Sequence, residues 1–477
     1  MKNVIRHFFL ITTLFFTSNS HANTDSINQL LTDIKSAQKN AINSGAVILL
    51  VDKNDVLVNI HIGKADWNDE TELSNDHMFR IGSISKSFAA ILAMRMQQTG
   101  KLDIRLPFNH YVQKQYLQKQ LISNTFSDTP ITIEQLMEHT AGLAGLSAKE
   151  WSYNKSDELS IEQALRLKKG DHNTHWQPGR HHSYTNAGYG LLGLVLEKAG
   201  GKSYESLMDE YVFNPMGMKS STLLLDKKAK ARLITGYDTD GKKKIPYWHN
   251  IYRPFAAINT DAKDLIQFLQ LLLNDGKIND QIFLTKDSIK RIETPKTSLA
   301  AADKLSYGYA LANYSWQRNG FTFRGHGGDA DGYLSRYGYS RESGLAYFVM
   351  VNAFNYQPIG KLRRLLEDYI TKDLIKKLPQ TLTLSESELV KYLGEYNSVT
   401  SRFSAGKKKS KTKKLRVYRK GGKLYMKKDH ENAFIIEPVT KKHFRFIDET
   451  VATFAFVTLD DSLYLQGDMG NYQKIEY

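Results

Sequence analysis

The order in which strand-like and helix-like segments follow one another constrains the fold of this chain most strongly. Strand patterns lie at residues 46–51, 56–62, 321–324, 333–339 and 345–352. Helical periodicity fills the long stretch between the second and third of these, as at Ile84, Phe88 and Ile91, and further helices are expected at residues 25–43 and 359–377. This order predicts an α/β (α+β) sandwich, an antiparallel sheet flanked by helices with an inserted helical region.

The chain changes character after Pro379. Short β-rich runs then follow one another at close spacing, separated by clusters of Gly, Asp, Asn and Lys, as at residues 415–418 and 453–457. This pattern predicts a small C-terminal antiparallel β-barrel. We therefore expect a main domain at residues 23–378 and a barrel domain at residues 385–477.

The N-terminus has the parts of a secretory signal peptide. Lys2 and Arg6 precede an apolar run at residues 8–16, and Ser20-His21-Ala22 then offers small residues for cleavage. A membrane anchor is the alternative, but the run is too short to cross about 30 Å of hydrocarbon. We predict removal of residues 1–22, leaving an exported protein, periplasmic or extracellular, without a transmembrane anchor.

Composition narrows the chemistry that the chain can perform. It contains no cysteine, which excludes disulfides, a thiol nucleophile and a cysteine-ligated metal. Reactive groups must therefore come from Ser, Lys, Tyr, His and carboxylate side chains. Lys and Arg outnumber Asp and Glu by 65 to 50, and the net charge of +15 favours anionic partners.

A basic segment stands out between Arg402 and Lys428, which holds Lys and Arg but no Asp or Glu. One interpretation is a solvated hairpin with a basic tip at residues 407–414. The other is that residues 407–428 contact an anionic cell-wall or lipid surface. We expect no nucleic-acid binding, because no basic and aromatic platform occurs outside this segment.

The spacing Ser-x-x-Lys occurs five times, so the spacing alone carries little information. It begins at Ser36, Ser83, Ser152, Ser404 and Ser410. Ser83 differs because a glycine turn at Gly82 opens a strongly periodic helix there, and a helix N-terminus stabilises negative charge on the serine oxygen. Lys86 lies one turn along the same face and can ease deprotonation of Ser83.

Two further motifs each occur once. Tyr184-Thr185-Asn186 would by itself be an ordinary loop, and Gly325-His326-Gly327-Gly328 would by itself be a strand whose glycines allow close backbone approach. With the Ser83 motif, in this order, they resemble the serine β-lactamase and penicillin-binding-protein superfamily in its class C-like branch. The resemblance covers residues from about 25 to 375, and the segment around Tyr392 to Tyr396 resembles the start of an appended lipocalin-like barrel.

This resemblance implies a role for each motif residue. It makes Ser83 the nucleophile, Lys86 its activator and Tyr184 the partner base and leaving-group acid, with His326 as a further catalytic residue where many relatives have lysine. The backbone N–H groups of Ser83 and Asp329 would form the oxyanion hole. The implied substrate-binding residues are Asn186, Gly327, Gly328, Asp329 and Asn352. Whether Lys86 or Tyr184 takes the serine proton stays open.

Two other patterns could indicate a dinucleotide cofactor or a metal site, but each lacks the surrounding sequence that such a site requires. The glycines of residues 188–193 fit a dinucleotide fingerprint, yet no apolar strand precedes them. Four histidines, His172, His175, His181 and His182, lack helical metal-ligand spacing. His139 is interpreted as a structural hydrogen-bonding residue. We expect neither a cofactor nor a metal.

The sequence thus favours an exported serine hydrolase that forms an acyl-enzyme at Ser83. Its expected substrate is a small amide or ester, with a peptide containing D-amino acids as the leading class. Because His326 replaces the lysine typical of efficient β-lactamases, strong β-lactamase activity is not expected. The alternatives are a small-ester or lipolytic esterase of the same fold and a catalytically silent cell-wall-binding protein.

Overall fold

The computed structural model of the chain describes most of its residues. These are residues 18–39, 45–68, 71–112, 121–146, 159–167, 172–400, 413–429, 431–467 and 470–476, with side chains from residue 24 onward. The predicted signal segment up to residue 17 and the basic tip up to residue 412 lie outside them.

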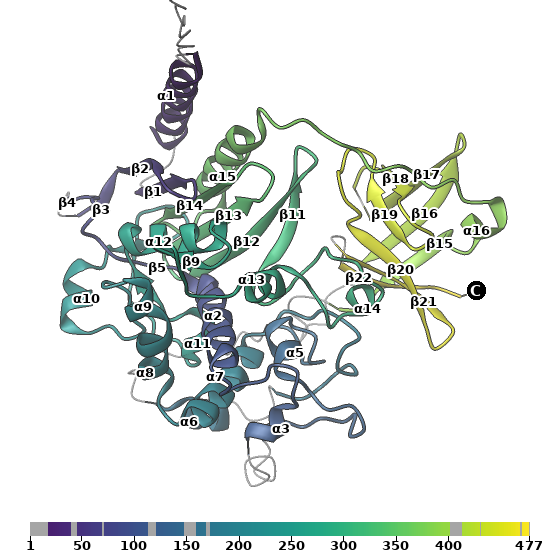
Figure 1. Cartoon of the computed structure of the whole chain (residues 1–477), viewed down its shortest axis with the longest axis horizontal. Helices are drawn as coiled ribbons and strands as arrows, with labels where there is room; N and C mark the ends of the chain where they lie inside the picture. Colours follow the sequence, from purple (N-terminus) through teal and green to yellow (C-terminus); the bar gives the residue numbers. More distant parts are fainter. Residues whose placement is uncertain are drawn as a thin grey trace, which may run out of the picture.

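A six-stranded antiparallel sheet lies at the centre of the main domain, with the order β11-β12-β13-β14-β1-β2 (Figure 1). Its strands are β1 Ala46–Val51, β2 Val56–Ile62, β11 Tyr314–Arg318, β12 Phe321–Ala330, β13 Tyr333–Ser340 and β14 Leu345–Val351. Strand β1 is apolar at every position because both of its faces are covered. Val47 and Leu49 join one core, while Ile48 and Leu50 join the core on the opposite face.

Two helices distant in sequence cover one face of the sheet. They are α1, Ser18–Lys39, and α15, Tyr356–Thr371. Leu30 and Ile34 of α1 share a core with Leu362 and Leu366 of α15. The expected N-terminal helix therefore exists and begins earlier than residue 25, at Ser18, while residues 40–43 lie outside the described part of the chain.

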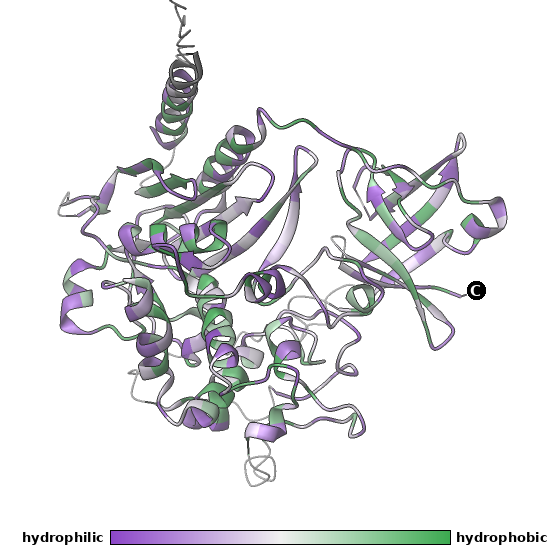
Figure 2. Cartoon of the chain, in the orientation of Figure 1, coloured by the Kyte–Doolittle hydropathy of each residue, from purple (hydrophilic) through white to green (hydrophobic). Residues whose placement is uncertain are grey.

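The inserted helical region covers the other face of the sheet. Its helical elements are η1 Gly82–Ile84, α2 Ser85–Gln98, α3 Phe108–Tyr111, α5 Ile133–Met137, α6 Ile161–Leu167, α7 Asn186–Gly200, α8 Tyr204–Met208, η3 Asp209–Phe213, α9 Asn214–Met216, α10 Lys227–Arg232, α11 Arg253–Ala256, α12 Ala262–Leu273, α13 Lys286–Glu293 and α14 Leu299–Ala302. Figure 2 shows that α2 and α7 are largely hydrophobic, as expected for helices buried inside a domain.

Short two-stranded ribbons connect these helices. They are β3 Lys64–Asp66 with β4 Thr71–Glu72, β5 Phe79–Arg80 with β8 Asn259–Thr260, β6 Gly236–Tyr237 with β7 Lys244–Ile245, and β9 Lys277–Ile278 with β10 Gln281–Ile282. The ribbon of β5 and β8 matters most for the site, because the turn that carries Ser83 follows β5. The predicted sandwich with an inserted helical region is confirmed.

Eight strands close into the predicted C-terminal barrel. A short helix, α16 Glu386–Val390, leads into β15 Gly394–Ser398, β16 Lys414–Lys420, β17 Lys423–Lys428, β18 Phe434–Pro438, β19 His443–Phe446, β20 Phe454–Leu459, β21 Ser462–Gly467 and β22 Gly470–Lys474. Aromatic side chains fill its interior, among them Tyr392, Tyr396, Phe444 and Phe456. The domain limits 23–378 and 385–477 stay a prediction.

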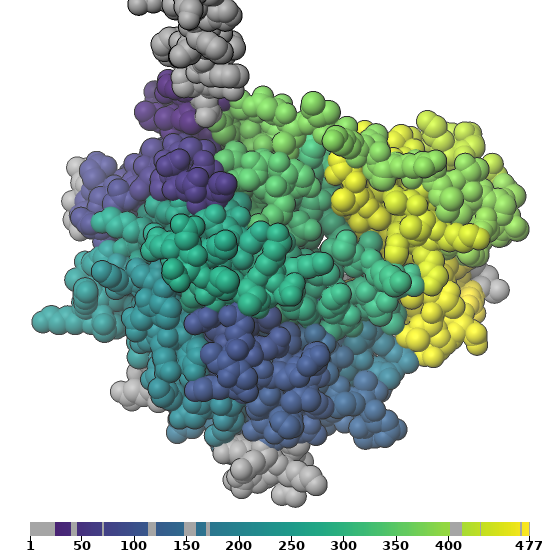
Figure 3. Space-filling view, viewed as in Figure 1, coloured from purple at the N-terminus to yellow at the C-terminus, as the bar shows by residue number. Residues whose placement is uncertain are grey.

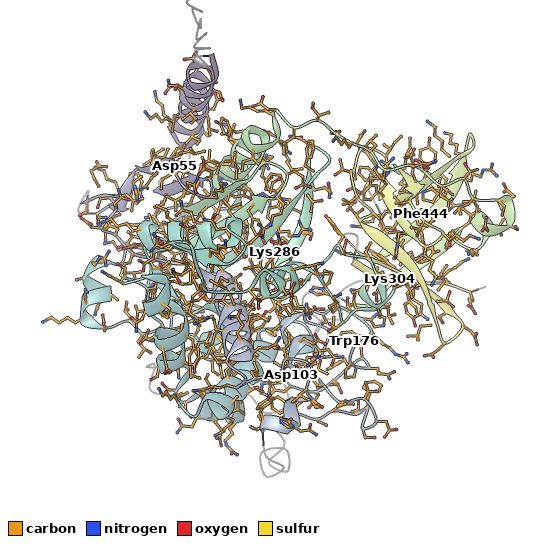
Figure 4. All side chains as sticks on the ribbon, in the orientation of Figure 1. Asp55, Asp103, Trp176, Lys286, Lys304 and Phe444 are labelled. Atoms are coloured by element: carbon orange, nitrogen blue, oxygen red, sulfur yellow. The ribbon has the colours of Figure 1, made fainter. Side chains whose placement is uncertain are left out.

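The barrel packs directly against the main domain (Figure 3). Helix α14 contacts β20 and β21, and Ala300 and Tyr307 share an apolar cluster with Ala455 and Val457 of the barrel. In Figure 4, Lys304 lies at this junction and Phe444 lies within the barrel. No helix among the described residues is both long and apolar enough to cross a membrane.

Strand β12 approaches the turn that carries Ser83 more closely than side chains would allow. A Cβ atom added at Gly328 would lie 1.8 Å from the carbonyl oxygen of Ile81. The hydroxyl of Ser335 on β13 donates to the same Ile81 oxygen at 3.0 Å. Glycine at position 328 is therefore required for this approach. Strand β12 is also longer than the predicted 321–324, because its glycine-rich second half is held by this contact.

We expect the Gly328→Ala variant to lose about 2 kcal/mol or more of unfolding free energy, because the methyl group forces β12 away from the serine turn. Gly360→Ala is the control: it lies inside α15, where the added Cβ would meet only Arg364 Nη1 at 3.5 Å. That change should be neutral or stabilise by up to about 1 kcal/mol. Urea unfolding of both variants measures the difference, and equal stabilities would contradict the close contact.

Candidate active site

Ser83 lies in a tight turn between β5 and α2, within the short helix η1. The turn needs Gly82, whose φ of +51° is in the left-handed region. Two hydrogen bonds to Ile258 hold the turn: Ile81 N donates to the Ile258 carbonyl at 3.2 Å, and Ile258 N donates to Ser85 Oγ at 3.1 Å. Ser83 itself is partly exposed while residues on either side are buried, so its hydroxyl is accessible to a substrate.

Lys86 is fully buried beside Ser83, with an exposed fraction of 0%. Its Nζ donates to Ser83 Oγ at 3.0 Å, to Asn186 Oδ1 at 2.9 Å and to the carbonyl oxygen of Phe255 at 3.2 Å. These acceptors come from η1, α7 and α11. An ammonium group has three protons to donate, so this environment suits the charged form of lysine.

Tyr184 lies at the start of α7, two residues before Asn186. Its ring centroid is 4.9 Å from Lys86 Nζ, within the range of a cation–π interaction. The structure therefore brings Ser83, Lys86, Tyr184 and Asn186 together, although a hundred residues separate Lys86 from Asn186.

His139 packs against the ring of Tyr184 and binds the backbone next to it. It is buried, its φ is +58° although it is not glycine, and its ring centroid lies 4.2 Å from that of Tyr184. The backbone N–H of Thr185 donates to His139 Nδ1 at 3.2 Å, and Ser183 N donates to the His139 carbonyl at 2.7 Å. His139 thus acts as the structural hydrogen-bonding residue that the sequence predicted.

His326 lies on β12 with its ring near Tyr184, at a centroid distance of 6.2 Å. It is only 2% exposed, Nδ1 lies 2.6 Å from the Gly327 carbonyl oxygen, and Nε2 lies 2.8 Å from the hydroxyl of Tyr309. Because a carbonyl can only accept, Nδ1 donates to the Gly327 oxygen, whereas the hydrogen bond between Nε2 and the Tyr309 hydroxyl can run in either direction. These two bonds hold the imidazole at both ring nitrogens.

The remaining residues of this motif contribute backbone rather than side chains. A Cβ atom at Gly82 would lie 2.8 Å from Asp329 N, so the backbone of Asp329 lies against the serine turn. The Asp329 carboxylate accepts from Arg336 Nη1 at 2.8 Å and from the Tyr356 hydroxyl at 2.7 Å. A Cβ atom at Gly327 would meet the Arg336 side chain. An oxyanion hole made by the N–H groups of Ser83 and Asp329 stays a prediction.

Asn352 does not join this group. It is 0% exposed, its Oδ1 accepts from Gly45 N at 2.7 Å, and its Nδ2 donates to the carbonyl oxygens of Lys64 and Thr235 at 3.1 Å. Both ends of the Asn352 amide are thus bonded to backbone groups of three other segments, and the substrate-binding role expected for Asn352 stays a prediction.

Two buried histidines of the site, His139 and His182, have lowered pKa values. Burial, together with the neighbouring His182, Lys86 and His326, holds the pKa of His139 well below its usual value. Burial also lowers the pKa of His182 to about 4. Both imidazoles are therefore neutral near pH 7 and add no positive charge beside Lys86.

The histidines and glycines that could have indicated a metal or dinucleotide site take structural positions. His172 Nδ1 contacts the Leu121 carbonyl at 2.8 Å and its Nε2 the Tyr252 hydroxyl at 3.0 Å, whereas His181 lies against the barrel. The described residues contain no group of three or more His, Asp or Glu side chains that could hold a metal. Gly190 and Gly193 lie inside α7, where an added Cβ would collide with Tyr252 and Pro254 respectively.

Sequence reasoning missed two parts of the site. Tyr309 carries no motif, and only the tertiary structure places its hydroxyl on His326. The carbonyl oxygen of Phe255 is a backbone atom, so no side-chain pattern could identify it as a ligand of Lys86.

Curated relatives match part of the chain. Protein flp of Staphylococcus aureus (strain MW2) is 26% identical over 254 residues, which are 52% of this chain and 49% of flp. A β-lactamase of Providencia stuartii is 26% identical over 263 residues, which are 54% of this chain and 61% of that protein. The chain thus spans about half the length of flp and 61% of the β-lactamase.

A solved structure supports the fold over nearly the whole chain. The octameric penicillin-binding protein homologue from Pyrococcus abyssi matches with a TM-score of 0.59 at 20% identity, covering 94% of this chain and 100% of that one. The family model described as Beta-lactamase matches residues 34–370, which include Ser83, Lys86, Tyr184 and His326. The chain therefore belongs to the Beta-lactamase family.

Proposed function

We propose that the protein is an exported serine hydrolase that forms an acyl-enzyme at Ser83 and releases the acyl group to water. The hydrogen bond from Lys86 Nζ to Ser83 Oγ, 3.0 Å long, carries this proposal. A partly exposed hydroxyl beside a buried cation is the arrangement expected of an activated serine. It argues against the alternative of a catalytically silent wall-binding protein.

In the proposed reaction, Ser83 Oγ attacks the substrate carbonyl carbon and loses its proton. Three acceptors surround Lys86 Nζ, which favours a lysine that remains protonated and stabilises the developing negative charge. Tyr184, in its phenolate form beside the Lys86 ammonium, takes the serine proton, becomes a neutral phenol and then passes the proton to the leaving group. Water attacks the acyl-enzyme by the reverse route and regenerates Ser83. Asn186 fixes the position of the Lys86 ammonium throughout.

A small peptide is the leading substrate because strand β12 offers a backbone edge next to Ser83. The pairing of β11 with β12 reaches Gly325, and from His326 to Ala330 no other described strand lies on that side of β12. An extended peptide can add to such an edge by main-chain hydrogen bonds. We propose a peptide containing D-amino acids, as in bacterial cell walls, processed by a carboxypeptidase or aminopeptidase reaction.

A small-ester or lipolytic esterase is the second candidate. Both ring nitrogens of His326 are already hydrogen-bonded within the protein, which leaves neither for a substrate carboxylate and favours an uncharged ester. The proposal also includes export after cleavage of residues 1–22. It further includes contact of the basic segment 407–428 with an anionic cell-wall or lipid surface.

Covalent labelling tests the nucleophile. We expect a penicillin or a fluorophosphonate to add one acyl or phosphonyl group to the wild type, and Ser83→Ala to abolish that mass increase while the fold is kept. Ser36→Ala is the matched control, since Ser36 and Lys39 have the same spacing on α1. Intact-mass spectrometry measures the adduct. A label found on another serine would exclude Ser83 as the nucleophile.

Lys86 and Tyr184 should act as one unit. We expect Lys86→Met and Tyr184→Phe each to lower kcat/KM about 100-fold or more, because each removes a group needed for proton transfer or charge stabilisation. The double variant should be little worse than the poorer single variant. Steady-state hydrolysis of a small ester and of a D-peptide measures these losses. Two small, additive losses would point to a site elsewhere.

Acid should destabilise the fold through the buried histidines. Burial lowers the pKa of His181 and of His182 to about 4, below the model-peptide value of 6.5. Between these values the unfolded chain binds more protons than the folded chain, so stability is lost as the pH falls from about 6.5 to 4. His182→Phe keeps an aromatic ring but has no nitrogen to protonate, so it should remove on the order of 2 kcal/mol of this loss of stability. Thermal unfolding across this pH range measures it, and an identical pH dependence in both proteins would contradict it.

A further inference from the structure

The C-terminal barrel holds the segment of backbone that carries Tyr184. Gln466 of β21 donates through Nε2 to the Arg180 carbonyl at 2.8 Å, and the same nitrogen lies 3.1 Å from His181 Nδ1. Gln466 is only 2% exposed. Arg180 also forms an ion pair of 2.8 Å with Asp460 of the barrel.

Two further barrel residues converge on a second carbonyl group of this segment, that of His182. Asn471 Nδ2 donates to the His182 carbonyl oxygen at 2.9 Å, and Thr400 Oγ1 donates to the same oxygen at 3.0 Å. Asn471 Nδ2 also donates to Thr400 Oγ1 at 3.0 Å. The Asn471 amide, the Thr400 hydroxyl and the His182 carbonyl thus bond to one another, which fixes the His182 carbonyl oxygen two residues before Tyr184. Asn471 is 8% exposed, so these bonds are largely protected from water.

The main domain holds the same segment from the other side. His139 binds the backbone N–H groups of Ser183 and Thr185. Carbonyl groups before Tyr184 thus bind the barrel, while N–H groups on either side of Tyr184 bind the main domain. The tyrosine lies between these two sets of bonds, so its position depends on both.

A second route connects the barrel to the site. Ala455 and Val457 of the barrel pack against Tyr307, which precedes Tyr309 by two residues. Tyr309 contacts His326 and lies 6.1 Å from the Tyr184 ring between centroids. The barrel therefore supports both the segment that carries Tyr184 and one wall beside it.

The barrel interior gives no alternative role to these contacts. Its described core is filled by aromatic and aliphatic side chains, including a Phe444, Phe454 and Phe456 cluster with centroid distances of 5.1 to 6.2 Å. A filled barrel of eight strands is a packed core rather than a ligand cup.

We propose that the barrel completes the active site, with Thr400, Gln466 and Asn471 acting as positioning residues for Tyr184. This inference rests on the proposed function of Ser83, Lys86 and Tyr184. A displacement of about 1 Å at a reacting group can cost on the order of 100-fold in rate. Loss of a bond to the His182 or Arg180 carbonyl should therefore lower kcat without a change in substrate binding.

The test compares isosteric and conservative variants of the full-length protein. Thr400→Val removes the hydroxyl and Thr400→Ser keeps it, while Gln466→Glu replaces the amide donor by a carboxylate oxygen. We expect Thr400→Val, Gln466→Glu and Asn471→Leu to lower kcat about 10- to 100-fold with KM within twofold, and Thr400→Ser to stay within threefold of wild type. Lys442→Ala, which breaks the exposed ion pair with Asp303 in the same interface, should leave kcat unchanged.

A mutant cycle separates positioning from general destabilisation. Because the effect acts through the Tyr184 hydroxyl, Asn471→Leu should change kcat less than twofold in the Tyr184→Phe background. Equal losses in both backgrounds, or unchanged kcat in Thr400→Val and Gln466→Glu, would overturn the inference. Circular dichroism and thermal unfolding identify any variant that fails to fold, in which case Thr400→Val against Thr400→Ser decides.

The failure of this inference can be told from the failure of the proposed function. A wild-type protein that is not labelled at Ser83 would overturn the proposed function. The positioning role alone would be overturned if the wild-type protein is labelled at Ser83 and the Thr400→Val and Gln466→Glu variants are labelled at the same rate as the wild type.

Discussion

The burial of the Lys86 ammonium is the constraint on which the rest of the site depends. A charged group removed from water costs several kcal/mol unless other groups replace its hydration. Three acceptors do so here, from the Ser83 turn, from Asn186 at the start of α7 and from the Phe255 carbonyl in α11. These elements must meet at one point for the chain to fold with this lysine inside. Stability and the geometry around Ser83 are therefore set by the same contacts.

The sheet supplies the opposite wall of the site. Strand β12 can approach the serine turn because Gly82 and Gly328 have no side chains where the two backbones meet. Ser335 then ties the next strand to the Ile81 carbonyl. The backbone edge of β12, the turn of Ser83 and the buried lysine thus form one connected unit rather than three separate motifs.

The barrel extends this unit beyond the family's own segment. The family match ends at residue 370, yet hydrogen bonds from Gln466 and Asn471 reach the residues just before Tyr184. An appended domain that binds backbone carbonyl groups can fix a loop without contributing a reacting atom. On the proposed positioning role, a barrel with a filled interior can thus affect the chemistry of the neighbouring domain.

The sequence by itself determined the order of elements, the alternation of the strands and the three motifs. Strands β1 and β2 begin and end where the apolar pattern does, because β1 is buried on both faces and periodicity records burial directly. The sequence also predicted that Ser83 and Lys86 lie together, as the structure has them, since the helix that joins them is local.

Other features were decided only by the tertiary structure. Asn352 matches a family segment, but its amide is consumed by three backbone segments that the sequence cannot place near it. Tyr309, the Phe255 carbonyl and the bonds from the barrel to the Tyr184 segment join residues far apart in the chain. Such contacts leave no periodic trace in the sequence, because they depend on where whole elements pack rather than on which residue follows which.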